Sequence, residues 1–216
     1  MQTTHVYTKK EEIVNAITHG IGVLLSITAL VFLILKSVST GSTFHVVTYT
    51  IYGATMILLY LSSTLVHSFP EGKAKDIFEI FDHSAIYLFI AGTYTPFTLI
   101  VIDGAMGWTL LSVVWGIAIV GVVFKSFFVK RFILISTVLY VVMGWLIVIA
   151  WNPLVIALPQ GGLVLLVVGG VLYTIGSIFY VWRGFHYHHA VWHVFVLLGT
   201  MAHFFAVLFY VSAVKV

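Results

Sequence analysis

Seven long apolar segments follow one another along almost the whole chain, and they restrict what it can fold into. A helix that crosses a bilayer needs about 20 apolar residues, and none of the segments alternates with the period of two that a membrane strand needs. Only 8% of the 216 residues are charged, against about 25% in a soluble domain. We therefore predict an all-α integral membrane protein, a bundle of seven transmembrane helices over residues 13–36, 45–68, 77–101, 106–126, 131–151, 161–182 and 189–213.

The helices are expected to form a single membrane domain, residues 13–213, after a short N-terminal tail, residues 1–12. The connections between them are short and rich in turn residues. Pro96 lies inside the third segment and should kink it. The predicted turns are Thr40-Gly41-Ser42, Pro70-Glu71-Gly72, Asp103-Gly104, Asn152-Pro153 with Pro159-Gln160-Gly161-Gly162, and Arg183-Gly184.

The basic residues predict the orientation of the bundle, because cytoplasmic loops carry an excess of Lys and Arg. Eight of the ten Lys and Arg residues lie at one set of helix ends, whereas Lys36 and Lys215 lie at the opposite set. The N-terminus is thus predicted to be cytoplasmic and the C-terminus outside. The basic residues are too scattered to bind nucleic acid. The predicted cytoplasmic side holds Lys9, Lys10, Lys73, Lys75, Lys125, Lys130, Arg131 and Arg183.

Polar and ionisable residues gather at the predicted cytoplasmic ends of four segments. Such residues are costly inside a membrane and commonly functional. This clustering was not used to assign the orientation, so it indicates a site at that end of the bundle. The residues are Glu12, Asn15 and His19 in the first segment, Ser63 and His67 in the second, Asp82 and His83 in the third, and His189 and His193 in the seventh.

His189 and His193 are spaced i, i+4, which places both imidazoles on one helix face. Two such rings can bind one metal ion, and a catalytic zinc usually has three protein ligands and an open position. His67 is the natural third ligand, with Ser63 and Asp82 beside the metal. The chain has no cysteine to act as a thiolate ligand.

Other interpretations of these residues remain open. A single histidine near a helix end is more often a packed residue than a ligand. His186 and His188 could be loop residues or alternative ligands, although their expected place in the loop favours His189. A serine-hydrolase triad of Ser63, His67 and Asp82 is conceivable, but nothing marks an oxyanion hole.

These motifs resemble those of the progestin and adiponectin receptor family, and the short loops resemble its hemolysin III branch most closely. The resemblance runs from about residue 10 to residue 213. It implies a cytoplasmic N-terminus and zinc held by His67, His189 and His193, with a conserved serine at Ser63 and an aspartate that contacts metal-bound water at Asp82. The motifs are Glu12-x-x-Asn15-x-x-x-His19, Ser63-x-x-x-His67, Phe81-Asp82-His83, and His189-x-x-x-His193 followed by His203.

Two functions fit these residues best. One is a zinc-dependent hydrolase of a lipid amide or ester, which the similarity to alkaline ceramidases favours on the amide side. Asp82 would then be a general base or an orienting group, and Ser63 would place substrate or water. The other is a non-enzymatic cytolytic channel or regulator of membrane state with a structural zinc ion. A receptor for a lipid ligand ranks below both.

Overall fold

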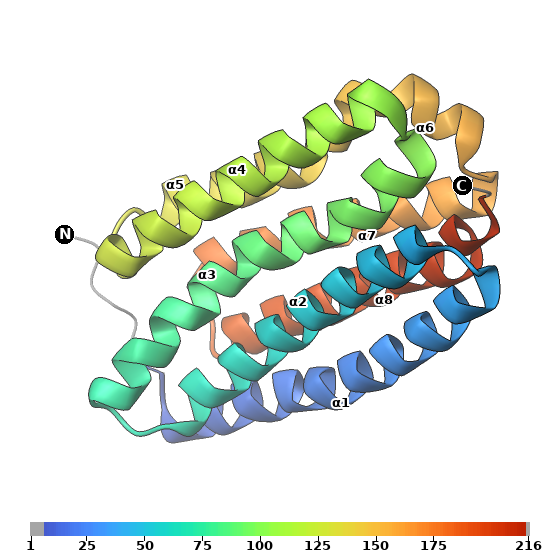
Figure 1. Cartoon of the computed structure of the whole chain (residues 1–216). Helices are drawn as coiled ribbons and strands as arrows, with labels where there is room; N and C mark the ends of the chain where they lie inside the picture. Colours follow the sequence, from blue (N-terminus) through green and yellow to red (C-terminus); the bar gives the residue numbers. More distant parts are fainter. Residues whose placement is uncertain (1–6, 215–216) are drawn as a thin grey trace.

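A computed structural model describes residues 7–214, and within this range the chain is helical and contains no strand (Figure 1). Seven segments of this range are long and apolar enough to cross a membrane, which confirms the predicted fold class. The elements are α1 (Lys9–Thr40), α2 (Thr43–Ser68), α3 (Lys73–Pro96), the π-helix η1 (Phe97–Ile102), α4 (Gly104–Phe128), α5 (Ile133–Trp145), the 3-10 helix η2 (Leu146–Ala150), α6 (Trp151–Ala157), α7 (Gln160–Val181), α8 (His188–Phe209) and the 3-10 helix η3 (Val211–Ala213).

The third span, α3 with η1, is the central one. In its most apolar stretch 83% of the residues are buried, against 22–44% in the other six spans. α3 packs between α2 and α4, α1 packs against α2 and α8, and α7 joins α5 to α8 (Figure 1). The outer helices expose large apolar side chains such as Leu24, Val120 and Ile156, as expected of surfaces in contact with lipid acyl chains.

One end of the bundle collects the basic residues. It is formed by the start of α1 and by the connections α2–α3, α4–α5 and α7–α8, and we call it the basic end. The eight Lys and Arg residues assigned above to the cytoplasmic side all belong to it. Lys36 lies near the opposite end, and Lys215 is outside the described residues.

The first helix begins earlier than the sequence suggested. Residues 9–12, predicted to belong to the tail, form the first turn of α1. The reason is a capping box, in which the Thr8 hydroxyl accepts a hydrogen bond from the Glu11 N–H and the Glu11 carboxylate accepts one from the Thr8 N–H. These two bonds satisfy N–H groups that a helix start leaves without partners.

The expected kink at Pro96 is a change of helix type. α3 ends at Pro96 and continues as the π-helix η1. Opposite it, α5 changes to the 3-10 helix η2, and the Tyr94 hydroxyl bridges this irregular backbone. It accepts from the Ile147 N–H at 2.7 Å and lies 2.9 Å from the Met143 carbonyl oxygen. Backbone groups freed inside the membrane are thereby satisfied within the protein.

The predicted turn at Asn152-Pro153 is wrong. The fifth span continues through η2 and α6 to Ala157, and the connection to α7 is reduced to Leu158 and Pro159. Pro153 lies in the first turn of α6, where its missing N–H would have had no helical partner. A proline at this position is compatible with a helix, so it did not mark the end of the span.

Gly121 on α4 allows the close approach of α3, and we predict a large loss of stability on its replacement. A Cβ atom there would meet ring atoms of Tyr87 at 2.7 Å, and that buried ring is itself packed against Tyr140. Gly121→Ala should lower the free energy of unfolding by about 1–3 kcal/mol. Thermal unfolding in detergent would measure this.

Gly116 provides the matched control on the same helix. A Cβ atom at Gly116 meets nothing within 4 Å, and alanine favours a helix over glycine by about 1 kcal/mol. Gly116→Ala should therefore leave the melting temperature unchanged or raise it. Equal melting temperatures for the two variants would show that the α3–α4 contact does not depend on Gly121.

Candidate metal centre

Three histidine side chains meet at the basic end of the bundle. His67 lies in the last turn of α2, and His189 and His193 lie on one face of the first turns of α8. One ring nitrogen from each lies within 4.8 Å of the others, and all three residues are buried. The ring centroids are 4.5–5.3 Å apart. The i, i+4 pair and the distant His67 therefore converge as the sequence predicted.

The His67 ring has its orientation set by a carboxylate. His67 Nδ1 lies 2.5 Å from Glu12 Oε2. A carboxylate can only accept a hydrogen bond, so Nδ1 carries the proton and Nε2 keeps its lone pair. That Nε2 atom is buried and has no hydrogen-bond partner.

The His193 ring is held by a hydroxyl that the sequence analysis missed. His193 Nδ1 lies 3.0 Å from Thr18 Oγ1. The Thr18 hydroxyl donates its hydrogen to the backbone carbonyl oxygens of Val14 and Asn15, both 2.9 Å away. It therefore accepts from His193 Nδ1–H, and His193 Nε2 keeps its lone pair.

These nitrogen atoms fit a zinc ion. His189 Nδ1, like His67 Nε2, is buried without a hydrogen-bond partner. Leaving such atoms unsatisfied is costly unless something binds them. Three imidazoles form a ligand set that zinc accepts readily, with a fourth position open. The group could therefore hold a metal ion.

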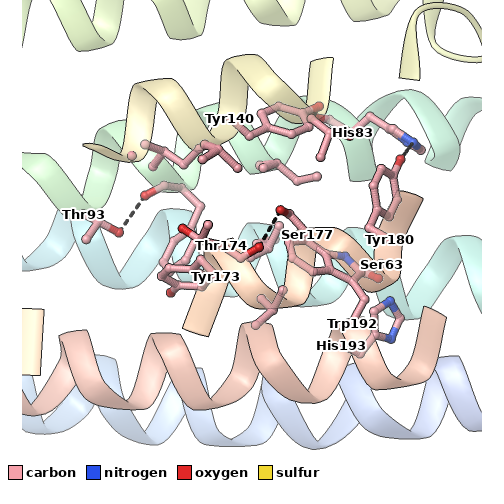
Figure 2. Close-up of a pocket in the computed structure, with 18 of the residues that line it drawn as sticks. Ser63, His83, Thr93, Tyr140, Tyr173, Thr174, Ser177, Tyr180, Trp192 and His193 are labelled. Carbon is pink, nitrogen blue, oxygen red and sulfur yellow. Dashed lines mark hydrogen bonds between the residues drawn. The ribbon is translucent and has the colours of Figure 1, made fainter. Parts of the chain in front are cut away.

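A cavity of about 120 Å³ begins at this group and extends into the bundle. The volume is close to that of engineered cavities that bind benzene, about 150 Å³. Figure 2 shows His193, Ser63 and Tyr180 at one end and Thr93 at the other. Asp82 lines the same cavity as His189 and His193. The two residues predicted to be catalytic, Ser63 and Asp82, therefore share a space with two of the predicted ligands.

His83 lies beside this space but is occupied by hydrogen bonds. Its Nδ1 lies 2.9 Å from the Glu79 carbonyl and its Nε2 lies 3.0 Å from the Tyr180 hydroxyl (Figure 2). Its Nδ1 is also 3.6 Å from Asp82 Oδ2. His83 therefore orients the Tyr180 side chain, which lines the same cavity.

Asn15 and His19 line the α1 side of the site. The His19 ring stacks on His193 with centroids 3.5 Å apart and packs edge-on against Tyr60. Both side chains are buried, and their polar atoms have no hydrogen-bond partner. His19 also lines the cavity.

His203, the last histidine of the family motifs and a candidate supporting residue, lies away from the metal group. It is ten residues beyond His193 on α8, or about 15 Å along the helix axis. Its Nε2 lies 3.0 Å from the Leu166 carbonyl, and its ring lines the deeper part of the cavity. Any support that it gives the metal group is therefore indirect.

The structure also resolves the ambiguous tract that precedes His189. The His186 side chain is 85% exposed. His188, expected in the loop, is the first residue of α8 and is buried, with Nδ1 3.2 Å from the Phe179 carbonyl. Among the described residues, neither belongs to the three-histidine group.

Tyr7 packs against two rings of the group, and the sequence analysis missed it. Its ring centroid is 5.2 Å from that of His189 and 6.0 Å from that of His67. Burial raises the pKa of the Tyr7 hydroxyl, so it stays a neutral phenol at physiological pH. A single tyrosine ahead of a helix carries no signal in the sequence that would reveal this contact.

Fold and site together define a multi-pass membrane protein with a buried three-histidine group at one end of its helical bundle. A family model described as "Haemolysin-III related" matches residues 7–204, and the chain belongs to this family. This confirms the resemblance to the hemolysin III branch. No solved structure matches the chain.

Curated relatives show how far the similarity extends. The chain is 60% identical to the Hemolysin-3 homolog of Bacillus subtilis (strain 168), over 95% of this chain and 96% of that protein. It is 55% identical to Hemolysin-3 of Bacillus cereus, over 94% of this chain and 92% of that one. The human Monocyte to macrophage differentiation factor is 26% identical, over 91% of this chain and 83% of that protein. This distant similarity agrees with the wider resemblance predicted above.

Proposed function

We propose that this protein is a zinc-dependent hydrolase that cleaves an amide or ester bond of a membrane lipid. The observation that carries the proposal is the convergence of His67, His189 and His193 at the end of a cavity that Asp82 also lines. A carboxylate beside a three-histidine group supplies the components of a hydrolytic zinc site. The motifs resemble those of the wider superfamily that includes alkaline ceramidases, and this resemblance favours an amide.

The bound metal ion, Asp82 and Ser63 would each have a separate role in the hydrolysis. A zinc ion bound by the three histidines would supply a Lewis acid that polarises a carbonyl group and activates water near neutral pH. The Asp82 carboxylate would accept the proton of the attacking water and pass it to the leaving group. The Ser63 hydroxyl, one helical turn before His67, would donate a hydrogen bond to the substrate or to water.

The cavity supports a lipid as substrate. Apolar and aromatic side chains such as Ile86, Phe89 and Trp145 provide most of its lining. At about 120 Å³ it has room for a segment of an acyl chain, so the rest of the molecule would extend into the bilayer. The scissile bond would lie at the histidine end.

The basic residues support the location of the site. They gather at the same end of the bundle as the histidines, and cytoplasmic loops are enriched in such residues. The site would therefore face the cytoplasmic leaflet, with the N-terminus inside and the C-terminus outside. Relatives from two Bacillus species support the bacterial plasma membrane as its location.

Removal of the metal tests the proposed activity. Purified protein should release fatty acid from at least one member of a panel of ceramides, N-acyl lipids and lysophospholipids. Dialysis against a strong chelator should abolish the release, and one equivalent of zinc should restore it. Fatty acid release, measured by mass spectrometry, is the readout. A zinc-loaded protein that cleaves no member of the panel would refute the proposed hydrolase activity.

A second candidate is a non-enzymatic membrane protein with a structural zinc ion. The names of two relatives, Hemolysin-3 homolog and Hemolysin-3, favour a cytolytic protein. It would act as a channel or as a regulator of membrane state. Zinc would then tie α2 to α8 through His67 and the α8 pair. In this case chelation should lower thermal stability and alter release of dye from lipid vesicles, with no lipid cleaved.

A further inference from the structure

We propose that Glu12 is a positioning residue of the metal centre, which holds the His67 ring in its metal-binding orientation and is itself held by Lys75. The inference rests on the zinc site of the proposed function and deepens it. It assigns part of the zinc affinity to a carboxylate that does not touch the metal. A lipid hydrolase and a structural zinc protein would both depend on it.

Glu12 joins three helices at the basic end. Its Oε2 lies 2.5 Å from His67 Nδ1 on α2, and its Oε1 lies 2.5 Å from Lys75 Nζ on α3. All three side chains are largely buried, with exposed fractions of 6–17%. Each carboxylate oxygen thus has its own partner, and the carboxylate cannot turn without losing both.

This contact decides which nitrogen of His67 is available. The carboxylate accepts a hydrogen bond from Nδ1–H, so the lone pair sits on Nε2, which is buried and unpartnered. Metal-binding histidines commonly donate their other N–H to a carboxylate, which orients the ring and makes the ligand nitrogen more basic. Without Glu12, the ring would be free to rotate and to place its proton on Nε2.

The negative charge of Glu12 is a second reason to expect that this residue supports zinc binding. Three neutral imidazoles contribute no negative charge, and a divalent cation is costly to bury without compensation. Among the described residues, Glu12 is the carboxylate in hydrogen-bond contact with a ring of the group, whereas His193 contacts the neutral Thr18 hydroxyl. Loss of its charge should therefore weaken metal binding even if the His67 ring stayed in place.

Glu71, the second ion-pair partner of Lys75, provides a matched control. Lys75 Nζ also lies 2.9 Å from Glu71 Oε1, and the Glu71 side chain is 83% exposed. Glu71→Gln removes a carboxylate from the same ion-pair network without touching the Glu12–His67 contact. An effect specific to Glu12 therefore reflects its contact with His67 rather than a general loss of charge at this end.

The test is the zinc affinity of full-length protein in detergent, measured by competition with a chromophoric chelator. Glu12→Ala should weaken zinc binding about 10- to 100-fold. Glu12→Gln, whose amide oxygen can still accept a hydrogen bond from Nδ1–H but carries no charge, should show a smaller loss. Glu71→Gln should bind zinc as the unsubstituted protein does.

A second readout separates positioning from general destabilisation. In zinc-free protein labelled with 15N histidine, NMR should show the His67 proton on Nδ1, and in Glu12→Ala a mixture of both tautomers. Unchanged zinc affinity in a folded Glu12→Ala protein would overturn the inference and leave the zinc site standing. If Glu12→Ala does not fold, unchanged zinc affinity in Glu12→Gln would overturn the inference instead. An unsubstituted protein that binds no zinc would instead overturn the proposed function.

Discussion

Protein purified in detergent should carry about one zinc ion per chain, and replacing His67 or His193 by alanine should remove it. Each variant leaves two of the three histidines that converge at the basic end. Two imidazoles hold zinc far more weakly than three, so extensive dialysis should strip the variants. Mass-spectrometric metal analysis of the proteins, prepared side by side, measures this.

His186 supplies the control for these variants. It lies near the pair on α8, but its side chain is 85% exposed. His186→Ala should retain the full zinc content. Retention of zinc by both His67→Ala and His193→Ala, or its absence from the unsubstituted protein, would contradict the proposed metal centre.

Replacing Asp82 by asparagine should lower lipid hydrolysis about 100- to 10,000-fold, the usual contribution of a general base, while zinc stays bound. Asp82 lines the cavity with His189 and His193 but does not belong to the three-histidine group. Its amide replacement has nearly the same shape and cannot accept the proton of the attacking water. Initial rates of fatty acid release, normalised to zinc content, provide the measurement.

Asp76 is the matched control on the same helix. It forms an ion pair with Lys130 at 2.8 Å, and its side chain is 60% exposed. Asp76→Asn should therefore retain normal hydrolysis. If Asp82→Asn kept both its zinc and its activity, Asp82 would not be the base. If zinc only stabilises the fold, as in the non-enzymatic alternative, Asp82→Asn should have no effect other than on stability.

Much of the fold followed from local sequence. Each span requires about 20 apolar residues, and this requirement does not depend on neighbouring helices. The turns at Thr40-Gly41-Ser42 and Pro70-Glu71-Gly72 were also predictable, because few residue types suit such positions. The Asn152-Pro153 prediction was wrong because proline ends some helices and begins others, as at the first turn of α6.

The candidate ligands could also be found in the sequence. The i, i+4 spacing of His189 and His193 determines that they share a helix face. His67 could be added because it lies at the same end of its own span, and the resemblance to a known family supported the choice. The meeting of these three residues within 4.8 Å is a property of the folded bundle.

The sequence by itself determined that the chain belongs in a lipid bilayer, how many spans it has and at which end of the bundle polar side chains gather. These features follow from apolar length and helical period, which are local properties. Only the tertiary structure decided that Glu12 contacts both His67 and Lys75, and that Thr18 contacts His193. Between 55 and 175 residues separate these partners along the chain. No local pattern encodes such pairs, since the relative rotation and depth of packed helices depend on side chains along their whole length.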